Sequence, residues 1–198
     1  MSEIKSPKNS IYLASNSPRR QELLKQIGVS FDHLSVEIDE SRRALESPEA
    51  YVVRMALEKA AAGCEIAPGS KPILAADTTV VAGNDCLGKP RDEEHATSML
   101  RQLSGATHRV ISAVSVLANG EQHCVSSLSE ITFRTISDAE IAHYWRSGEP
   151  YDKAGAYAIQ GKGALFVARL VGSYSGVVGL PLHETEDLLA KVGISCWH

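Results

Sequence analysis

The chain has 198 residues, the usual size of one domain, and its hydrophobic content of 43% and charged content of 22% are typical of a globular protein with a core. Its formal net charge of −4 argues against a general nucleic-acid-binding protein, because a phosphate backbone attracts proteins of net positive charge. We expect a short loose tail over residues 1–9 and a single domain over residues 10–198.

The four cysteines lie far apart and include no CxxC pair. This spacing indicates free thiols in a reducing compartment rather than a disulfide framework or a zinc site. The first ten residues are polar and lack the apolar segment of a secretory signal. No stretch reaches the roughly 18 uninterrupted apolar residues of a membrane-spanning helix. The sequence therefore predicts a cytoplasmic protein without a membrane partner.

The first predicted elements are a strand over residues 11–14 and a helix that begins at Pro18. Ser17 is a favourable N-cap, and proline suits the first helical position. Arg19 and Arg20 then fall in the first turn, where the positive end of the helix dipole disfavours each cation by a few tenths of a kcal/mol, up to ~1. The arrangement indicates either a phosphate cradle of backbone N–H groups, serines and guanidinium groups, or a solvated loop with surface ion pairs.

The later elements follow from periodicity, caps and turns. Ser47-Pro48 opens a helix, Asn119-Gly120 is a strong hairpin signal, and residues 137–140 have the pattern of a capping box. The glycine-rich segments 154–163 and 172–179 are expected to be loops. The expected strands cover residues 29–36, 73–81, 107–118, 121–136 and 164–171. The expected helices cover residues 48–62, 92–103, 137–148 and 182–192.

This order of elements predicts a mixed α/β fold. Strands and helices alternate first, a long hairpin occupies the middle, and the last third alternates again. We expect one long, bent sheet flanked by helices, with two lobes around a central cleft.

Asp77 lies in the middle of an expected buried strand. A buried carboxylate is unfavourable unless it is paired, hydrogen-bonded or bound to a metal, and α/β proteins bind ligands near strand ends, so a functional role is favoured. A helix cap or a core ion pair would also explain it. Lys89, in a Gly-Lys-Pro turn, could reach the same place, although such lysines are usually solvated. Lys59 could simply favour a helix dipole, and Glu40 could be a surface charge.

Missing motifs exclude several classes of enzyme. The chain has no G-x-x-x-x-G-K-[ST] loop, no HExxH or paired Cys/His cluster, and no G-x-S-x-G elbow. The groups that remain are arginine, lysine, carboxylate and hydroxyl. These suit the handling of phosphate with a hard cation better than covalent catalysis.

Six segments together resemble the Maf-like nucleoside triphosphate pyrophosphatases, and the resemblance covers nearly the whole chain. Each motif is modest alone, but six in order at family-like spacing are specific. They are Leu-Ala-Ser-Asn-Ser-Pro-Arg-Arg (13–20), Ala-Asp-Thr-Thr-Val (76–80), Gly-Lys-Pro (88–90), Leu-Ser-Gly-Ala-Thr-His (103–108), Asp-Lys-Ala-Gly-Ala-Tyr-Ala-Ile-Gln-Gly (152–161) and Val-Gly-Leu-Pro (178–181).

Three positions resemble the branch of this family that hydrolyses dTTP and UTP. That branch has Arg after Ser-Pro, Thr after the catalytic Asp, and Gln in an Ile-Gln-Gly motif. Here these residues are Arg19, Thr78 and Gln160. The sister branch acting on 7-methyl-GTP typically has Trp after Ser-Pro.

The resemblance implies a Maf/ITPase-like fold, often dimeric, and metal-dependent cleavage of a nucleoside triphosphate to the monophosphate and pyrophosphate. It makes Asp77 the proton acceptor and associates Arg19, Thr78 and Gln160 with base specificity. The phosphate-binding positions that it implies are Ser15, Ser17, Arg20, Lys59 and Lys89.

The resulting hypothesis places Mg²⁺ or Mn²⁺ on Asp77 and Glu40. Asp77 and the cation activate a water that attacks the α-phosphorus, and Gln160 reads the imide edge of uracil or thymine. The expected partners are a normal or modified pyrimidine nucleotide and a second copy of the chain, with neither nucleic acid nor membrane.

Two other functions stay open at this point. One is a non-catalytic nucleotide-binding regulator of septum formation, since the family has been linked to division arrest. Such a sensor could discard the acid, so the presence of Asp77 favours an enzyme. The other is a phosphatase that removes only the γ-phosphate, which would release inorganic phosphate instead of pyrophosphate.

Overall fold

A computed structural model describes residues 10–197; the tail expected over residues 1–9 and the last residue lie outside the described part. The strands are β1 (Ser10–Ala14), β2 (Ser30–Leu34), β3 (Ile73–Ala82), β4 (Asp85–Leu87), β5 (Thr107–Ala118), β6 (Glu121–Phe133) and β7 (Val167–Val171). The α-helices are α1 (Pro18–Gln26), α2 (Pro48–Ile66), α3 (Glu93–Leu103), α4 (Asp138–Arg146), α5 (Tyr174–Val178) and α6 (Leu182–Lys191). Three short 3₁₀-helices are η1 (Glu149–Asp152), η2 (Ala154–Ala156) and η3 (Lys162–Phe166). No helix of the described part is long and apolar enough to cross a membrane.

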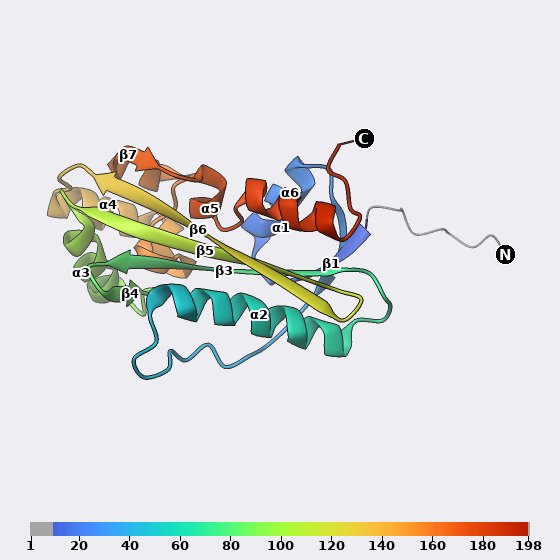
Figure 1. The fold of residues 1–198 in the computed structure, drawn as a ribbon. Coiled ribbons are helices and arrows are strands. Elements are labelled where there is room, and N and C mark those ends of the chain that lie inside the picture. Colours follow the sequence, from blue (N-terminus) through green and yellow to red (C-terminus); the bar gives the residue numbers. More distant parts are fainter. Residues whose placement is uncertain (1–9, 198) are drawn as a thin grey trace.

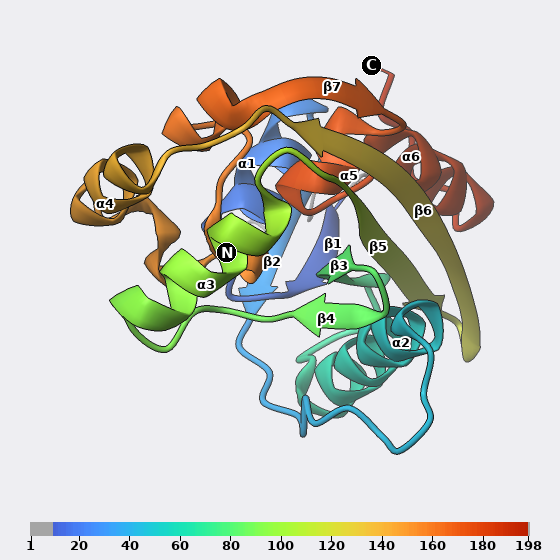
Figure 2. The same ribbon diagram turned by 90° about the vertical axis from the view of Figure 1, so that its left-hand side faces the viewer.

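One mixed sheet holds the seven described strands, in the order β2-β1-β3-β5-β6-β7 with β4 paired to β3. The strands β1, β2 and β3 are parallel to their neighbours in this group, and the other pairings are antiparallel. The long hairpin of β5 and β6 is strongly curved (Figures 1 and 2). The predicted mixed α/β fold with a long, bent sheet is therefore confirmed.

The hydrogen-bond ladder of β3 is interrupted along one edge. β1 pairs with this edge only at Ile73 and Leu74, and β4 pairs with it from Val80 onward. On the other edge, β5 follows β3 without interruption. Over residues 75–79, no described strand pairs with the first edge, so the sheet is open beside the end of β1.

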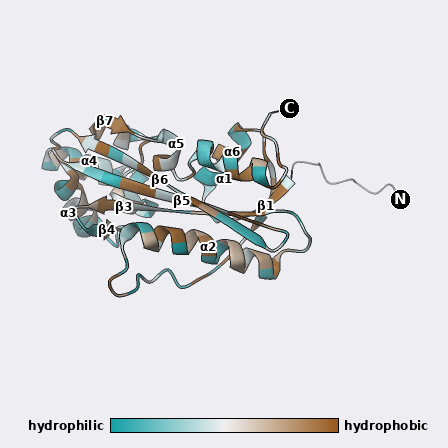
Figure 3. Ribbon diagram, viewed as in Figure 1, coloured by the Kyte–Doolittle hydropathy of each residue, from teal (hydrophilic) through white to brown (hydrophobic). Residues whose placement is uncertain are grey.

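Helices cover both faces of the sheet. α2 packs on one face, α1, α5 and α6 lie on the other, and α3 and α4 cover one end (Figures 1 and 2). Figure 3 shows hydrophobic residues along the central strands.

Two large apolar cores lie on the long strands. One gathers around Leu100 and Phe133, the other around Leu13 and Leu189, and Val178 packs against both. These cores form the two predicted lobes.

The helix caps and the hairpin turn predicted from the sequence are present at several elements. The hydroxyl of Ser47 accepts a hydrogen bond from the N–H of Ala50 at 3.1 Å, and the capping box at the start of α4 is complete. Asn119 and Gly120 have φ values of 53° and 81°, the left-handed conformation that a tight two-residue hairpin needs. The cap of α1 differs, because the side chain of Ser17 makes no capping hydrogen bond.

Several boundaries differ from the expected ones. α2 continues beyond residue 62 to Ile66, and it stops there because Ala67 precedes a proline and adopts an extended conformation. β2 ends at Leu34 because that residue pairs with the last residue of β1. β6 ends at Phe133, short of residue 136, where the chain turns toward the cap of α4.

The sequence patterns missed one helix, α5, and one strand, β4. α5 lies inside the expected loop 172–179, where the hydroxyl of Ser173 caps it by accepting from the N–H of Gly176. β7 begins only at Val167, because the preceding residues form η3. β4 has three residues, which is too short for a visible alternation. The single domain over residues 10–198 stays a prediction.

Candidate active site

A cleft of about 660 Å³ opens at the interruption beside β3, between the two lobes. We call one side of it the strand wall, which is the set Ser15, Arg20, Lys59, Asp77 and Thr78, and the other side the loop wall, which is the segment 149–163. The structure places all ten residues predicted from the sequence along this cleft: Ser15, Ser17, Arg19, Arg20, Glu40, Lys59, Asp77, Thr78, Lys89 and Gln160.

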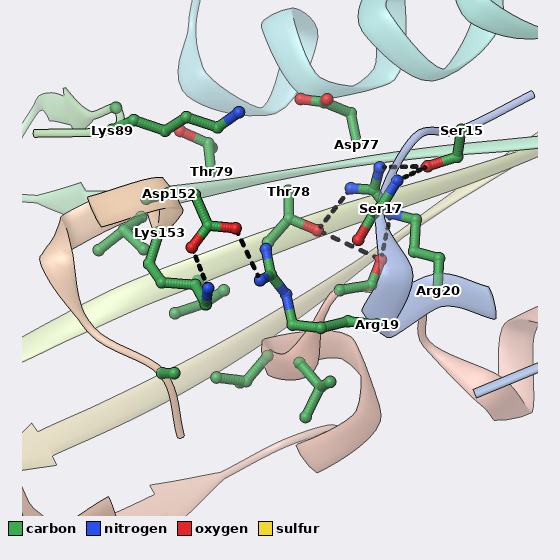
Figure 4. A pocket seen from close by; sticks show the side chains of 18 of the residues that line it. Ser15, Ser17, Arg19, Arg20, Asp77, Thr78, Thr79, Lys89, Asp152 and Lys153 are labelled. Atoms are coloured by element: carbon green, nitrogen blue, oxygen red, sulfur yellow. Dashed lines mark hydrogen bonds and ion pairs between the residues drawn. The ribbon is translucent and has the colours of Figure 1, made fainter. Parts of the chain in front are cut away.

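Asp77 and Thr78 point to opposite faces of the sheet, because side chains alternate along a strand (Figure 4). Asp77 faces α2, where the ammonium of Lys59 donates to its Oδ1 at 2.8 Å. Lys59 Nζ also lies 2.7 Å from Glu40 Oε1, so one ammonium joins two carboxylates. Oδ2 of Asp77 accepts no hydrogen bond from a described residue, which leaves this oxygen for a water or ligand in the cleft.

Glu40 lies on an irregular loop that side chains of α2 hold in place. The phenol of Tyr51 donates to the Glu40 carbonyl at 3.1 Å, and burial raises the pKa of Tyr51 to about 12, so the phenol keeps its proton. Arg54 donates to the Ser41 carbonyl at 3.0 Å and to both carboxylate oxygens of Glu46 at 2.7 and 2.8 Å. Partial burial alone would raise the pKa of Glu40, but the hydrogen bond and charge of Lys59 outweigh it and hold this pKa below its ordinary value.

Arg20 reaches the cleft from the first turn of α1 on the opposite face of β3 (Figure 4). It donates from Nε to the Gly179 carbonyl at 2.8 Å, from Nη1 to Ser15 Oγ at 3.2 Å and from Nη2 to Thr78 Oγ1 at 3.4 Å. All three acceptors are neutral, and no carboxylate among residues 10–197 forms an ion pair with it. Burial lowers the pKa of Arg20 and Asp77 opposes this shift, but a guanidinium stays charged at neutral pH.

A chain of hydroxyl groups supports the guanidinium of Arg20. Thr78 Oγ1 lies 2.8 Å from Ser112 Oγ, and Ser112 in turn donates to the Gly176 carbonyl at 2.6 Å. The Ser112 proton is thereby used, so Thr78 donates to Ser112 and accepts from Arg20. The geometry thus connects Thr78 to the arginine, whereas the resemblance associated it with the base.

The first turn of α1 contributes no negative charge to the cleft. The N–H of Ser17 donates to Ser15 Oγ at 3.2 Å, and the turn contains no acidic residue. The turn itself therefore adds only neutral or positive side chains to the positive end of the helix dipole, which favours an incoming anion.

The loop wall faces this turn across the cleft. Arg19 Nη1 lies 3.5 Å from Asp152 Oδ2, and Asp152 also pairs with Lys153 (Figure 4). Lys89 extends into the cleft, and Gln160 is exposed on the loop wall; for neither side chain do the described residues provide a hydrogen bond. Both side chains are therefore available to a ligand.

Sequence reasoning missed several lining residues. Thr79 lies one position beyond Thr78, and strand alternation could have placed it on the face of Asp77. Asp152 and Lys153 stand at the start of one of the six motifs without having been assigned a role. Tyr51 and Tyr157 carried no local signal, because their position depends on contacts between distant segments.

The carboxylates of Glu40 and Asp77 are the donor pair to test against a divalent cation. They share one positive group, Lys59, at ion-pair distance, and their oxygens suit Mg²⁺ or Mn²⁺. Among residues 10–197 no group of three or more His, Cys, Asp or Glu side chains could hold a metal. Mg²⁺ needs only one or two protein carboxylates when phosphates and waters complete its shell. The pair therefore fits a cation that binds together with a nucleotide.

Comparison with known proteins reveals similarities over most of the chain. Residues 10–192 match a family described as Maf-like protein. A dTTP/UTP pyrophosphatase of Saccharophagus degradans is 53% identical over 94% of this chain and 90% of its own, and one of Salmonella typhimurium is 53% identical over 91% of each chain. A solved nucleoside-triphosphatase / dITP/XTP pyrophosphatase of Mycobacterium abscessus has a TM-score of 0.45 and 16% identity over 93% of this chain and 95% of that chain, which is too low to support an argument.

Proposed function

The chain belongs to the Maf-like protein family, and we propose that it hydrolyses dTTP and UTP to the monophosphate and pyrophosphate in the cleft between the strand wall and the loop wall. Support comes from the 53% identity to proteins named dTTP/UTP pyrophosphatase. The site observation that carries the proposal is that one cleft contains both a cation and a base that are available to a ligand. Arg20 has no carboxylate partner among the described residues, and Asp77 has a free oxygen.

The phosphates bind on the side of Arg20 in this proposal. Its guanidinium and the N–H groups of the first turn of α1 meet the triphosphate, and Lys89 approaches from the other side of the cleft. The same groups stabilise the charge that develops on the leaving pyrophosphate. Ser15 and Thr78 act by fixing the orientation of Arg20.

Asp77 is the proton acceptor in this proposal. Its free Oδ2 holds a water and takes a proton from it as the water attacks the α-phosphorus. Lys59 keeps Oδ1 occupied and so fixes the direction of the carboxylate. A divalent cation bound with the nucleotide near Glu40 and Asp77 would neutralise phosphate charge and make the attacking water more acidic.

Base recognition belongs to the loop wall in this proposal. The amide of Gln160 offers one acceptor and two donors, which match the alternating acceptor and donor groups on the imide edge of uracil or thymine. Arg19 lies near the same wall through its contact with Asp152. Its role in specificity is part of the proposal.

The proposal extends to the setting of the reaction. The enzyme acts in the cytoplasm as a homodimer on a free nucleotide, with neither nucleic acid nor a membrane as partner. The net charge of −4 and four free cysteines support the absence of a nucleic-acid partner and a reducing compartment.

Product analysis tests the reaction. The protein is incubated with each common triphosphate and Mg²⁺ or Mn²⁺, and the products are separated. We expect the monophosphate and pyrophosphate from dTTP and UTP. Release of inorganic phosphate alone would instead identify a γ-phosphatase, and nucleotide binding without turnover would identify a regulator.

A further inference from the structure

Gln160 lies on a segment without regular structure that side chains hold at both ends. The segment between η2 and η3 forms one tight turn, in which the N–H of Gly161 donates to the Ala158 carbonyl at 3.2 Å. Such a turn has few backbone hydrogen bonds of its own. Its position must therefore be set by contacts with the rest of the protein.

The carboxylate of Glu149 holds the downstream end of this segment. Its Oε2 accepts from the N–H of Lys162 at 2.9 Å, and its Oε1 accepts from the N–H of Gly163 at 3.0 Å. Hydrogen bonds and nearby charge overcome the effect of partial burial and hold the pKa of Glu149 below its ordinary value. The carboxylate is thus charged at neutral pH and makes strong hydrogen bonds.

The phenol of Tyr144 connects this carboxylate to the upstream end. It donates to Glu149 Oε1 at 2.7 Å and accepts from the N–H of Ala158 at 3.0 Å. Tyr144 is buried, and its ring packs edge-on against Phe166 at 5.0 Å between centroids. Burial, followed by the bond to Glu149, raises the pKa of Tyr144, so the phenol remains a donor.

Two glycines, Gly161 and Gly163, allow this close approach. A Cβ at position 161 would lie 2.3 Å from Glu149 Oε2, and one at position 163 would lie 2.8 Å from the phenol oxygen of Tyr144. Both glycines are therefore required for the carboxylate and the phenol to come this close. The close contact indicates a tightly packed support on both sides of Gln160.

We infer that Tyr144 and Glu149 are positioning residues that hold Gln160 for recognition of the pyrimidine base. The inference rests on the proposed function, because it needs Gln160 to contact the base. The two residues bind the backbone at positions 158, 162 and 163, which flank Gln160 on both sides. They touch neither phosphate-binding groups nor Asp77, so their loss affects the choice of base rather than the chemical step.

A double-mutant cycle tests this inference. The ratio of kcat/KM for UTP to that for CTP is measured in the wild type, Tyr144→Phe, Gln160→Ala and the double variant, because cytosine presents a donor where uracil presents an acceptor. We expect each single variant to lower the ratio by about tenfold through KM, the size expected when one or two buried hydrogen bonds are lost. In the Gln160→Ala background, Tyr144→Phe should change the ratio by less than about twofold, since coupled residues are not additive.

If Tyr144→Phe folds poorly, a second variant tests the same inference, and a matched control measures the effect of losing a buried phenol elsewhere. Glu149→Gln keeps the shape but loses the charge, and we expect a lower ratio with an unchanged kcat for UTP. Tyr12→Phe removes a phenol from another core and should leave the ratio as in the wild type.

The possible results separate the inference from the proposed function. A wild type that releases no pyrophosphate from UTP or dTTP overturns the proposed function. A fully active wild type in which Gln160→Ala lowers the ratio, but Tyr144→Phe and Glu149→Gln do not, overturns the inference alone. The inference is also overturned if Tyr144→Phe lowers the ratio equally with and without Gln160, which would indicate a general structural role.

Discussion

The strand wall and the loop wall of the cleft are built by different means. The strand wall takes its charged groups from regular elements, with Asp77 on β3, Lys59 on α2 and Arg20 in the first turn of α1. The loop wall takes Gln160 from a short irregular turn that depends on Tyr144 for its position. The three charged groups of the strand wall thus stand on regular elements, whereas the group proposed to read the base stands on a segment that can change without disturbing the sheet.

The largest effect should come from Asp77→Asn, which removes the proposed proton acceptor from the strand wall. We expect kcat for pyrophosphate release to fall by roughly 10²–10⁴-fold, the range of general base catalysis, while nucleotide binding persists because Arg20 is untouched. Pyrophosphate-release kinetics and titration calorimetry measure the two quantities. Asp85→Asn, on the exposed turn end of β4, is the matched control. Normal turnover by the Asp77 variant would show that the catalytic assignment is wrong.

Arg20→Lys tests the other face of β3. Lysine keeps the positive charge but cannot donate to Gly179, Ser15 and Thr78 at once. We expect kcat/KM for UTP to fall by about 10²-fold, as for other lost electrostatic donors. Steady-state kinetics across substrate concentrations gives the value, with the exposed Arg101→Lys as control. Equal activity of the two variants would mean that charge alone, without orientation, is sufficient.

Thr78→Val distinguishes two roles for one hydroxyl. The geometry connects Thr78 to Arg20 and Ser112, so we expect kcat/KM to fall by roughly 5–10-fold, the cost of one hydrogen bond, and by the same factor for UTP and CTP. Competition between the two nucleotides measures this. A selective loss for UTP would instead support the role in base specificity that the family resemblance implies.

The smallest effect concerns His108, which supports the loop wall through a 2.8 Å contact with the phenol of Tyr157. Burial lowers the pKa of His108 to about 4. The unfolded chain therefore binds more protons than the folded chain as the pH falls below the ordinary value of 6.5, and stability decreases. Between pH 8 and pH 6 this amounts to about 1 kcal/mol.

Thermal unfolding at several pH values checks this expectation. In His108→Gln the fall in Tm between pH 8 and pH 6 should be smaller than in the wild type by about 2–4 °C. His143→Gln, on the exposed side of α4, is the control for the loss of a histidine. An unchanged pH slope in His108→Gln would contradict the expectation, because it would mean that the ring binds protons equally in the folded and the unfolded chain.

Sequence reasoning predicted the strand wall better than the loop wall for a physical reason. The strand with Asp77 and the helix start with Arg19 and Arg20 follow from hydrophobic patterning and from helix-capping residues, which act over a few residues. The ion pairs of Lys59 with Glu40 and Asp77 cannot be predicted from such local signals. The loop that carries Glu40 is held by contacts with α2, such as the hydrogen bond from Tyr51.

The loop wall depends on contacts that leave no periodic signal. Gln160 was found through family resemblance, and its support by Glu149 becomes visible only in three dimensions. The helix α5 was hidden for a related reason, since its glycines suggest a loop while Ser173 caps it. Short elements stabilised by side-chain hydrogen bonds fall below what propensity and periodicity can detect.

The interrupted ladder of β3 means that the cleft exists before any nucleotide arrives. Pairing with β1 on one side and with β4 on the other fixes the rim of the opening, so no hinge has to move to create it. An arriving nucleotide therefore exchanges places with water inside a preformed frame, and displacement of hydration rather than ordering of the chain is expected to govern its affinity.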